Sequence, residues 1–209
     1  MGISVKDSKL VELARLISEW PGLTSRPAAE LIDDSLVLLD HLGEAHKVVD
    51  VGSGGGLPGL PLKIVRPDLS MTLIEADQDK AAFLVRACAV LGLHDVQVLA
   101  RRAEEVGQDP LYREAFDVAV ARALAAMPVL AELCLPLVRV GGRLLAQKTE
   151  SEELSGAGRA IEAMGGLLQV VVAAPSAARG AGTVVIVDKV RSTPPAYPRR
   201  PGVPARKPL

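Results

Sequence analysis

Aromatic residues and cysteines are scarce in this chain of 209 residues. Aromatics make up 2% of the sequence, so we expect no surface that stacks several nucleobases on aromatic rings. The two cysteines, Cys88 and Cys134, lie far apart and lack metal-ligand spacing. Two cysteines are too few for a disulfide scaffold, and so low a number suits a reducing compartment. The sequence therefore predicts no metal site.

The chain also lacks long apolar runs and an excess of charge of either sign. No segment is long and apolar enough to cross a membrane, and the first residues lack the apolar core of a signal peptide. The net charge of −1 excludes a global attraction to nucleic acid. The hydrophobic fraction of 49% supplies the core of one medium-sized domain. We expect a cytoplasmic monomer without a membrane partner.

One stretch organises the rest of the chain. Val48–Val51 is a short, mostly β-branched run that predicts a buried strand, and it leads directly into the glycine-rich segment Gly52–Gly56. A helix is expected over 57–66, with Pro58 near its first turn. Glycines allow close approach of the backbone, and a helix start offers unpaired N–H groups. The stretch therefore predicts a cradle for a nucleotide-like ligand.

Short apolar segments alternate with helical patterns from residue 48 onward. Strands are expected at 48–51, 71–75, 96–99, 116–121, 143–147, 167–172 and 183–189. Helices are expected between them at 57–66, 78–91, 126–138 and 152–164. This alternation predicts an α/β fold with a mostly parallel seven-stranded sheet covered on both faces. Residues 173–182 carry no helical pattern, so a hairpin and one antiparallel strand are expected there.

Two terminal segments flank the expected main domain at 47–190. Residues 1–46 carry helical periodicity around 10–17 and 27–42, which predicts a helical extension beside the sheet. Residues 191–209 form a basic tail rich in proline, which is expected to be extended or flexible.

The glycine turn favours one cofactor over another. The dinucleotide pattern G-x-G-x-x-G/A requires a small residue at position 57, where the chain has Leu57. Asp50 precedes alternating glycines at 52, 54 and 56, a pattern that resembles motif I of Rossmann-like methyltransferases that bind S-adenosylmethionine (SAM). A carboxylate there suits a cofactor with positive charges. Glu75 follows Gly52 at about the 20-residue spacing expected for a contact to ribose hydroxyls.

More specific motifs extend along nearly the whole chain. They are Asp50–Leu62 with its Leu-Pro-Gly-Leu-Pro continuation, Thr72–Glu75, Phe83-Leu84, Arg102–Glu105, Asp117–Ala123, Gly141-Gly142 before a strand ending in Lys148, and Tyr197–Gly202, with echoes at Leu23–Ser25 and Asp34-Ser35. Together they resemble the ribosomal RNA small-subunit methyltransferase G (RsmG/GidB) family.

The resemblance implies a Rossmann-like SAM-dependent methyltransferase that methylates N7 of a guanosine in the decoding-region loop of 16S rRNA. Its partners would be 16S rRNA or the small ribosomal subunit, and its product S-adenosylhomocysteine. Carried over by motif, the cofactor contacts fall on Gly52, Leu57, Ala103, Glu104 and Arg122. The turn and the spacing argument add Gly54 and Glu75. Arg122 would hold the carboxylate of SAM or a substrate phosphate.

Guanine N7 has a free lone pair, so its methylation requires no general base. We therefore expect alignment of the reactants, rather than an acid or a base, to supply the rate. RNA contacts must come from local basic patches. The candidates are Lys148, Arg199, Arg200, Arg206 and Lys207. Because most of these lie in the tail, the tail is predicted to act on RNA and to leave SAM affinity unchanged.

The chain departs from the family pattern at a few positions. Glu30 and Leu31 stand where many members carry Arg-His, Asp79 stands in a pair that is usually basic, and Thr149 replaces a glycine. The first two departures remove positive charge from positions that would face RNA, while the cofactor motifs are untouched.

Three other functions remain open at this point. The chain could methylate a protein or a small molecule, or bind SAM as a non-catalytic ribosome assembly factor. An NAD-dependent oxidoreductase is a third alternative, although Leu57 and the lack of a Tyr-x-x-x-Lys pattern disfavour it.

Overall fold

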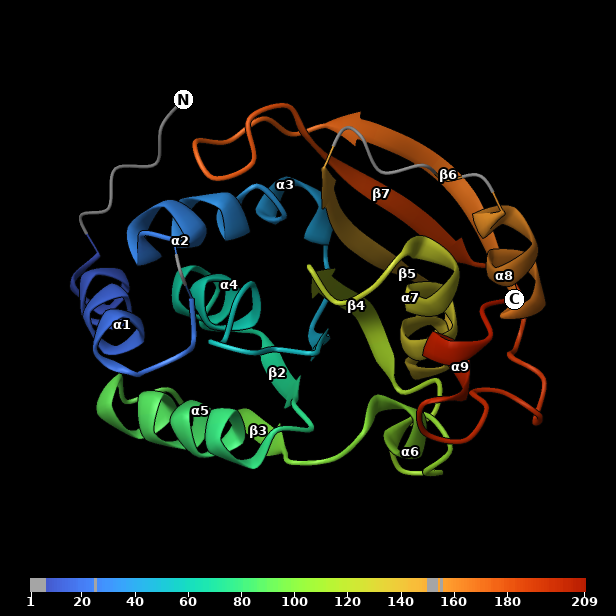
Figure 1. Cartoon of the computed structure of the whole chain (residues 1–209), viewed down its shortest axis with the longest axis horizontal. Coiled ribbons are helices and arrows are strands. Elements are labelled where there is room, and N and C mark those ends of the chain that lie inside the picture. The colour runs from blue at the N-terminus through green and yellow to red at the C-terminus, as the bar shows by residue number, and fades with distance from the viewer. Residues whose placement is uncertain (1–6, 25, 150–153, 155) are drawn as a thin grey trace.

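The centre of the fold is a sheet of seven strands in the order β3-β2-β1-β4-β5-β7-β6 (Figure 1). The computed structural model describes residues 7–24, 26–149, 154 and 156–209. The strands are β1 (Lys47–Val51), β2 (Ser70–Ile74), β3 (Val96–Leu99), β4 (Phe116–Arg122), β5 (Val138–Thr149), β6 (Gly166–Ala173) and β7 (Gly182–Lys189). β7 is antiparallel to both β5 and β6, and the other neighbouring pairs are parallel. The predicted α/β fold with one antiparallel strand is confirmed.

The central strand β1 is buried on both faces. Val48 belongs to the apolar cluster on one face of the sheet, and Val49 and Val51 belong to the cluster on the other. Successive side chains of a strand point to opposite faces, so a run of valines needs cover on both sides.

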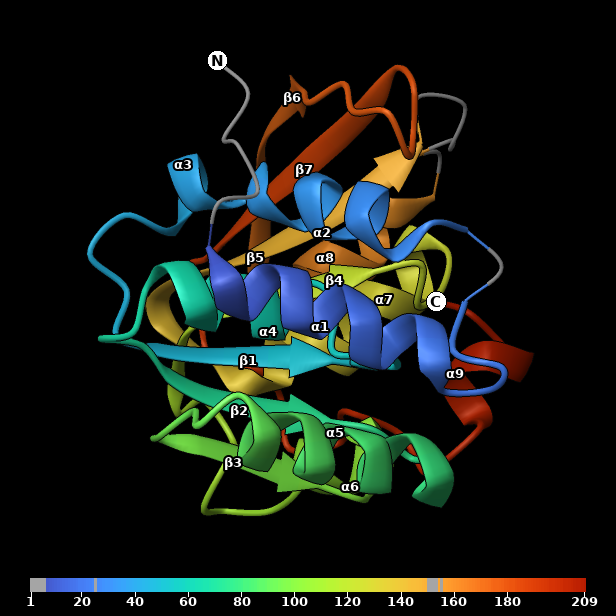
Figure 2. The ribbon, with the colours of Figure 1, turned by 90° about the vertical axis from the view of Figure 1, so that its left-hand side faces the viewer.

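Helices supply this cover. α1 (Ser8–Glu19), α2 (Ala28–Leu36), α4 (Gly59–Val65) and α5 (Gln78–Val90) contribute to one apolar cluster, and α7 (Met127–Cys134) and α8 (Ala157–Ala163) to the other (Figures 1 and 2). Shorter pieces are α3 (Leu39–Leu42), α6 (Ala103–Val106), α9 (Val203–Arg206) and the 3₁₀ turn η1 (Leu135–Leu137). The first part of the helix predicted over 152–164 lies outside the described residues, apart from residue 154.

The N-terminal helices form part of the layer on one face. Asp7 caps α1 by accepting a hydrogen bond from the N–H of Lys9 at 2.8 Å. Leu13 and Ile17 of α1 then share their cluster with the sheet residue Val48. The helix predicted over 27–42 is interrupted and forms α2 and α3 instead. The predicted boundary at residue 46 stays a prediction.

The pair Gly141-Gly142 lies inside β5 rather than in a turn before it, so that prediction was wrong. The pairing between β4 and β5 shifts register at this point, and Gly141 has φ +85°. A Cβ on Gly142 would collide with the carbonyl oxygen of Asp117. The two glycines therefore accommodate a bulge and let the strand begin at Val138.

The C-terminal tail is not simply extended or flexible, and that prediction is corrected. Residues 203–206 form α9, and the Arg113 side chain donates hydrogen bonds to the carbonyl oxygens of Thr193, Pro194 and Tyr197. These bonds join residues about 80 positions apart in sequence. Local periodicity carries no trace of such pairs, which explains why the sequence pattern did not reveal them.

Candidate cofactor site

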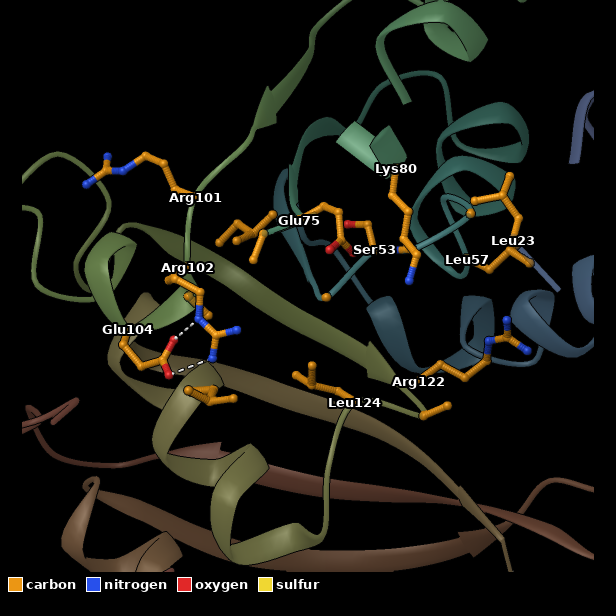
Figure 3. A pocket seen from close by; sticks show the side chains of 18 residues that line it. Leu23, Ser53, Leu57, Glu75, Lys80, Arg101, Arg102, Glu104, Arg122 and Leu124 are labelled. Atoms are coloured by element: carbon orange, nitrogen blue, oxygen red, sulfur yellow. Dashed lines mark hydrogen bonds and ion pairs between the residues drawn. The ribbon is translucent and has the colours of Figure 1, made fainter. Parts of the chain in front are cut away.

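A cavity of about 370 Å³ opens at the carboxyl ends of β1, β2 and β4 (Figure 3). Ligands of open α/β sheets bind at this edge. All seven residues predicted to contact the cofactor line the cavity: Gly52, Gly54, Leu57, Glu75, Ala103, Glu104 and Arg122. Leu23, Lys80, Arg102 and Leu124 line it as well. The structure thus gathers in one place residues that the sequence spreads over 70 positions.

The glycine turn lines this cavity, and larger residues do not fit at two of the glycine positions in and just after the turn. Gly52 has φ +73°, and a Cβ built on it would lie 2.5 Å from Cδ1 of Leu124. Gly59, which begins α4, would place a Cβ 2.8 Å from Oδ2 of Asp50. Both positions require the absence of a side chain, the first by conformation and the second by close approach.

Asp50 supports the turn and does not face the ligand cavity. It is fully buried, and its Oδ2 accepts the N–H of Gly59 at 2.9 Å. Burial raises the pKa of Asp50 to about 7, although the hydrogen bond from Gly59 works against this shift. Its role as a carboxylate next to the charges of the cofactor is therefore corrected: Asp50 fixes the start of α4.

Glu75 directly follows β2 and faces the cavity beside the turn (Figure 3). Its Oε2 accepts the N–H of Gly54 at 2.8 Å, and its Oε1 accepts the N–H of Asp77 at 2.9 Å. A carboxylate has about four lone-pair sites, so two N–H donors orient this group and leave it able to accept hydroxyl groups.

Glu104 lies at one end of the cavity, where Arg102 faces it (Figure 3). The carboxylate is 3% exposed, and it accepts hydrogen bonds from Nη2 of Arg102 at 2.9 Å and from the N–H of Gly202 at 2.8 Å. Burial alone would raise the pKa of Glu104, but these hydrogen bonds hold it below the usual value. The negative charge at this end is therefore retained.

Arg122 lies at the opposite end, beyond Leu124 (Figure 3). Burial lowers the pKa of its guanidinium, and the nearest carboxylate oxygen is Oδ2 of Asp34 at 3.8 Å. Nε of Arg122 and Oδ2 of Asp34 make no hydrogen bond within the part of the chain that the structure describes. The Nε of Arg122 is therefore a buried donor for which the described residues supply no acceptor.

A second cavity, of about 340 Å³, adjoins the first. The two share Arg122, Ala123 and Leu124 as a common wall. Cationic side chains gather around this second cavity: Arg26, Arg122, Lys148 and Arg179. Sequence reasoning included Arg122 and Lys148 but missed Arg26 and Arg179.

Arg179 is fixed beside the second cavity by the buried Asp34. Its Nε donates to Oδ1 of Asp34 at 2.6 Å, and its guanidinium also bonds the carbonyl oxygens of Lys148, Thr183 and Ala174. The one signal for this pair was the Asp34-Ser35 motif. Arg179 itself lies in a hairpin loop without a distinctive pattern.

The residues predicted to bind RNA do not form one patch. Lys148 is 5% exposed and donates to the carbonyl oxygen of Ala125 at the second cavity. The Arg199 side chain is bound to Glu132 by two hydrogen bonds, at 2.8 and 2.6 Å. The remaining three candidates lie at exposed positions in and around α9: Arg200, Arg206 and Lys207.

The positions that depart from the family pattern have different surroundings. Leu31 lies in the apolar core and lines the second cavity, where Arg26 supplies a positive charge. Asp79 is exposed, while its neighbour Lys80 lines the first cavity. Positive charge is therefore present at both cavities.

Comparison with known proteins places this chain in a family. The model for the rRNA small subunit methyltransferase G family matches residues 15–179. The chain belongs to this family. The family's enzyme from Moorella thermoacetica is 49% identical over 181 residues, covering 84% of this chain and 75% of its own length. The enzyme from Roseiflexus sp. strain RS-1 is also 49% identical, with coverage of 84% and 76%.

The resemblance read from the motifs is confirmed, and with it the assignment as a SAM-dependent methyltransferase. A solved structure supports the fold: the O-methyltransferase TomG of Streptomyces achromogenes, in complex with SAM, matches with a TM-score of 0.62 and 19% identity. That match covers 89% of this chain and 91% of TomG.

The described residues offer neither a membrane-spanning helix nor a cluster of side chains suited to a metal ion. None of the described helices is long and apolar enough to span a membrane. No group of three or more His, Cys, Asp or Glu side chains there is arranged to hold a metal ion.

Proposed function

We propose that this protein transfers the methyl group of SAM to N7 of a guanosine in 16S rRNA. The observation that carries the proposal is the single cavity lined by all seven motif residues, in a chain that belongs to the rRNA small subunit methyltransferase G family. The cavity volume of about 370 Å³ suits a small-molecule ligand such as SAM, since small-molecule sites span about 300–1,000 Å³.

The side chains present fit the cofactor. The glycine turn lets the ligand approach the backbone at Gly52, and Glu75 offers oriented oxygens to ribose hydroxyls. The opposite end offers Arg122, whose guanidinium lies 3.8 Å from its nearest carboxylate oxygen and can pair with a carboxylate of the ligand. The cavity thus has an acceptor on one side and a cation at the other end, as SAM requires.

When bound, SAM supplies an electrophilic methyl group on a sulfonium. The N7 lone pair forms the new C–N bond as the C–S bond breaks, so no proton moves and no base is required. The side chains therefore contribute alignment of the reacting atoms, together with exclusion of water. Leu57 and Leu124 supply apolar walls for this purpose.

We propose that the guanosine enters the second cavity. That cavity shares the wall formed by Arg122, Ala123 and Leu124 with the first. Arg26, Lys148 and Arg179 around it would attract the flanking phosphates. A local cluster of this kind allows an RNA substrate in spite of the net charge of −1.

Transfer of tritium from labelled SAM tests the proposal against its alternatives. The wild-type protein is incubated with deproteinised 16S rRNA, with intact small subunits that lack the modification, and with a total protein extract. We expect label in the rRNA of at least one of the first two samples. Label confined to protein or small molecules would contradict the rRNA substrate, and SAM binding without transfer to any acceptor would favour an assembly factor.

We further propose that the protein works as a monomer in the cytoplasm, with 16S rRNA or the small subunit as its partner. Light scattering after size exclusion checks the first point: the expected mass is 21.9 kDa, and a stable dimer would contradict it.

A further inference from the structure

The C-terminal segment Pro198–Arg206 lies against the helices that form one wall of the cofactor cavity. α6 contributes Ala103 and Glu104 to that wall, and α7 contributes Leu133. α9 packs on α7 (Figure 1). The segment therefore packs on a helix of the cavity wall, although none of its own residues lines the cavity.

The first anchor of the segment is the ion pair between Arg199 and Glu132 of α7. Glu132 is fully buried, and it accepts hydrogen bonds from the backbone N–H, Nε and Nη2 of Arg199 at 2.9, 2.8 and 2.6 Å. A two-pronged pair to a buried carboxylate is directional as well as strong. Arg199 thereby fixes where the following turn lies.

That turn makes the second contact. The N–H of Gly202 donates to Oε1 of Glu104 at 2.8 Å, so the segment holds a carboxylate of the cavity wall. Pro198 packs on α6 as well, since a Cβ on Gly107 would lie 2.8 Å from Cγ of Pro198. The other partner of Glu104 is Arg102, which donates from Nε and Nη2 at 3.2 and 2.9 Å and whose side chain is 49% exposed.

We propose that Pro198–Arg206 is a strap that positions the cofactor wall, and that Arg199 is a positioning residue acting through Glu104. This assignment rests on the proposed placement of SAM in the first cavity. It differs from the prediction that the tail serves RNA alone, because it makes SAM affinity depend on a residue outside the cavity.

The test measures SAM affinity of the full-length protein by calorimetry for Arg199→Ala, Arg199→Lys and the control Arg200→Ala. Arg200 is the adjacent arginine, and its side chain is exposed. We expect Arg199→Ala to raise the Kd for SAM at least fivefold, Arg199→Lys to raise it less, and Arg200→Ala to change it less than twofold. In steady-state assays the KM for SAM should rise while kcat at saturating SAM changes less than twofold.

A double-mutant cycle separates positioning from general loss of stability. In the background of Glu104→Ala, Arg199→Ala should add less than a twofold effect on Kd, because the contact through which it acts is already gone. Hydrogen–deuterium exchange over residues 195–207 should show release of the strap in Arg199→Ala.

Three results would overturn the strap. The first is an unchanged Kd for SAM in Arg199→Ala although hydrogen–deuterium exchange shows release of the strap. The second is no release of the strap in Arg199→Ala. The third is the same fold-change in Kd whether Arg199→Ala is made in the wild type or in Glu104→Ala. If Arg199→Ala does not fold, Glu132→Gln replaces it, with the same expected rise in Kd. A wild-type protein that did not bind SAM would overturn the proposed function too, whereas an unchanged Kd in a binding-competent protein would overturn the strap alone.

Discussion

The two adjoining cavities are built in different ways. The cofactor cavity depends on a turn whose residues follow one another, Gly52–Gly59, and on side chains at strand ends such as Glu75. The second cavity depends on Asp34 and Arg179, which are 145 residues apart, and their ion pair is almost fully buried. Backbone geometry thus shapes the first cavity, while paired charges shape the second. Substitutions at the first cavity should therefore reduce ligand binding, while substitutions at the second should reduce the stability of the fold.

The largest expected effect on ligand binding is at the first cavity. Gly52→Val places a branched side chain where even a Cβ lies 2.5 Å from Leu124, at φ +73°. We expect SAM binding to fall more than 100-fold in calorimetry, with RNA affinity in a filter assay retained within about twofold. Gly158→Ala is the control, since Gly158 lies in α8 and a Cβ there meets nothing within 4 Å. Equal loss of RNA affinity in Gly52→Val would show that the cavities are not separable.

Asp50 should make the stability of the glycine turn depend on pH. Burial raises its pKa to about 7 from the ordinary value of 3.8, so the folded state binds its proton more tightly than the unfolded state does. The contribution of Asp50 to the free energy of unfolding is therefore fully present below about pH 4. It is lost as pH rises through 7, by up to about 4 kcal/mol. Asp50→Asn should remove that decline, as followed by urea unfolding between pH 4 and 8. Parallel curves for the variant and the wild type would refute the assignment.

Removal of the buried charge pair tests the second cavity. Arg179→Gln leaves Asp34, which is fully buried, with the hydroxyl of Ser176 and the distant Arg122, and should lower the free energy of unfolding by about 3 kcal/mol. The double variant Asp34→Asn/Arg179→Gln should recover part of that loss, because no buried carboxylate is then left without its arginine partner. Arg143→Gln is the control, since its pair with Asp188 is 3.7 Å long and partly exposed, and it should cost less than about 1 kcal/mol. Strictly additive losses in the double variant would contradict the pairing.

The smallest expected effect concerns one hydrogen-bonding group of the first cavity. In Glu75→Gln an amide nitrogen replaces an oxygen that now accepts an N–H from Gly54 or Asp77. SAM affinity should fall about tenfold, or about 1.4 kcal/mol, while the second cavity is unchanged. Asp79→Asn serves as the control for loss of a nearby carboxylate, because Asp79 is exposed. A Kd equal to that of the wild type would remove Glu75 from the cofactor contacts.

Sequence reasoning succeeded where the signal is local. The strand over Val96–Leu99 was predicted with the bounds that the structure has. The seven residues predicted to contact the cofactor line one cavity, and their contacts with SAM stay a prediction. It failed for α6 and α9, since helices of four residues are too short to show periodicity and are stabilised by their surroundings.

The missed contacts are those between distant positions. Arg199 was predicted to bind RNA, but its side chain is bound to Glu132, 67 residues away. Asp50 was interpreted as a carboxylate near the positive charges of the cofactor, because spacing shows that a carboxylate is near a turn but not which way it points. Pairing and side-chain direction are tertiary properties, and neither can be seen in a single sequence.

The most direct test is to map the modified nucleotide. Small subunits from cells that lack the enzyme are incubated with the wild-type protein and SAM, and nuclease fragments of their 16S rRNA are analysed by mass spectrometry. The account predicts one new 7-methylguanosine that requires SAM and is absent with Gly52→Val. A methyl group on another atom or base, or no new methylation of 16S rRNA, would contradict it.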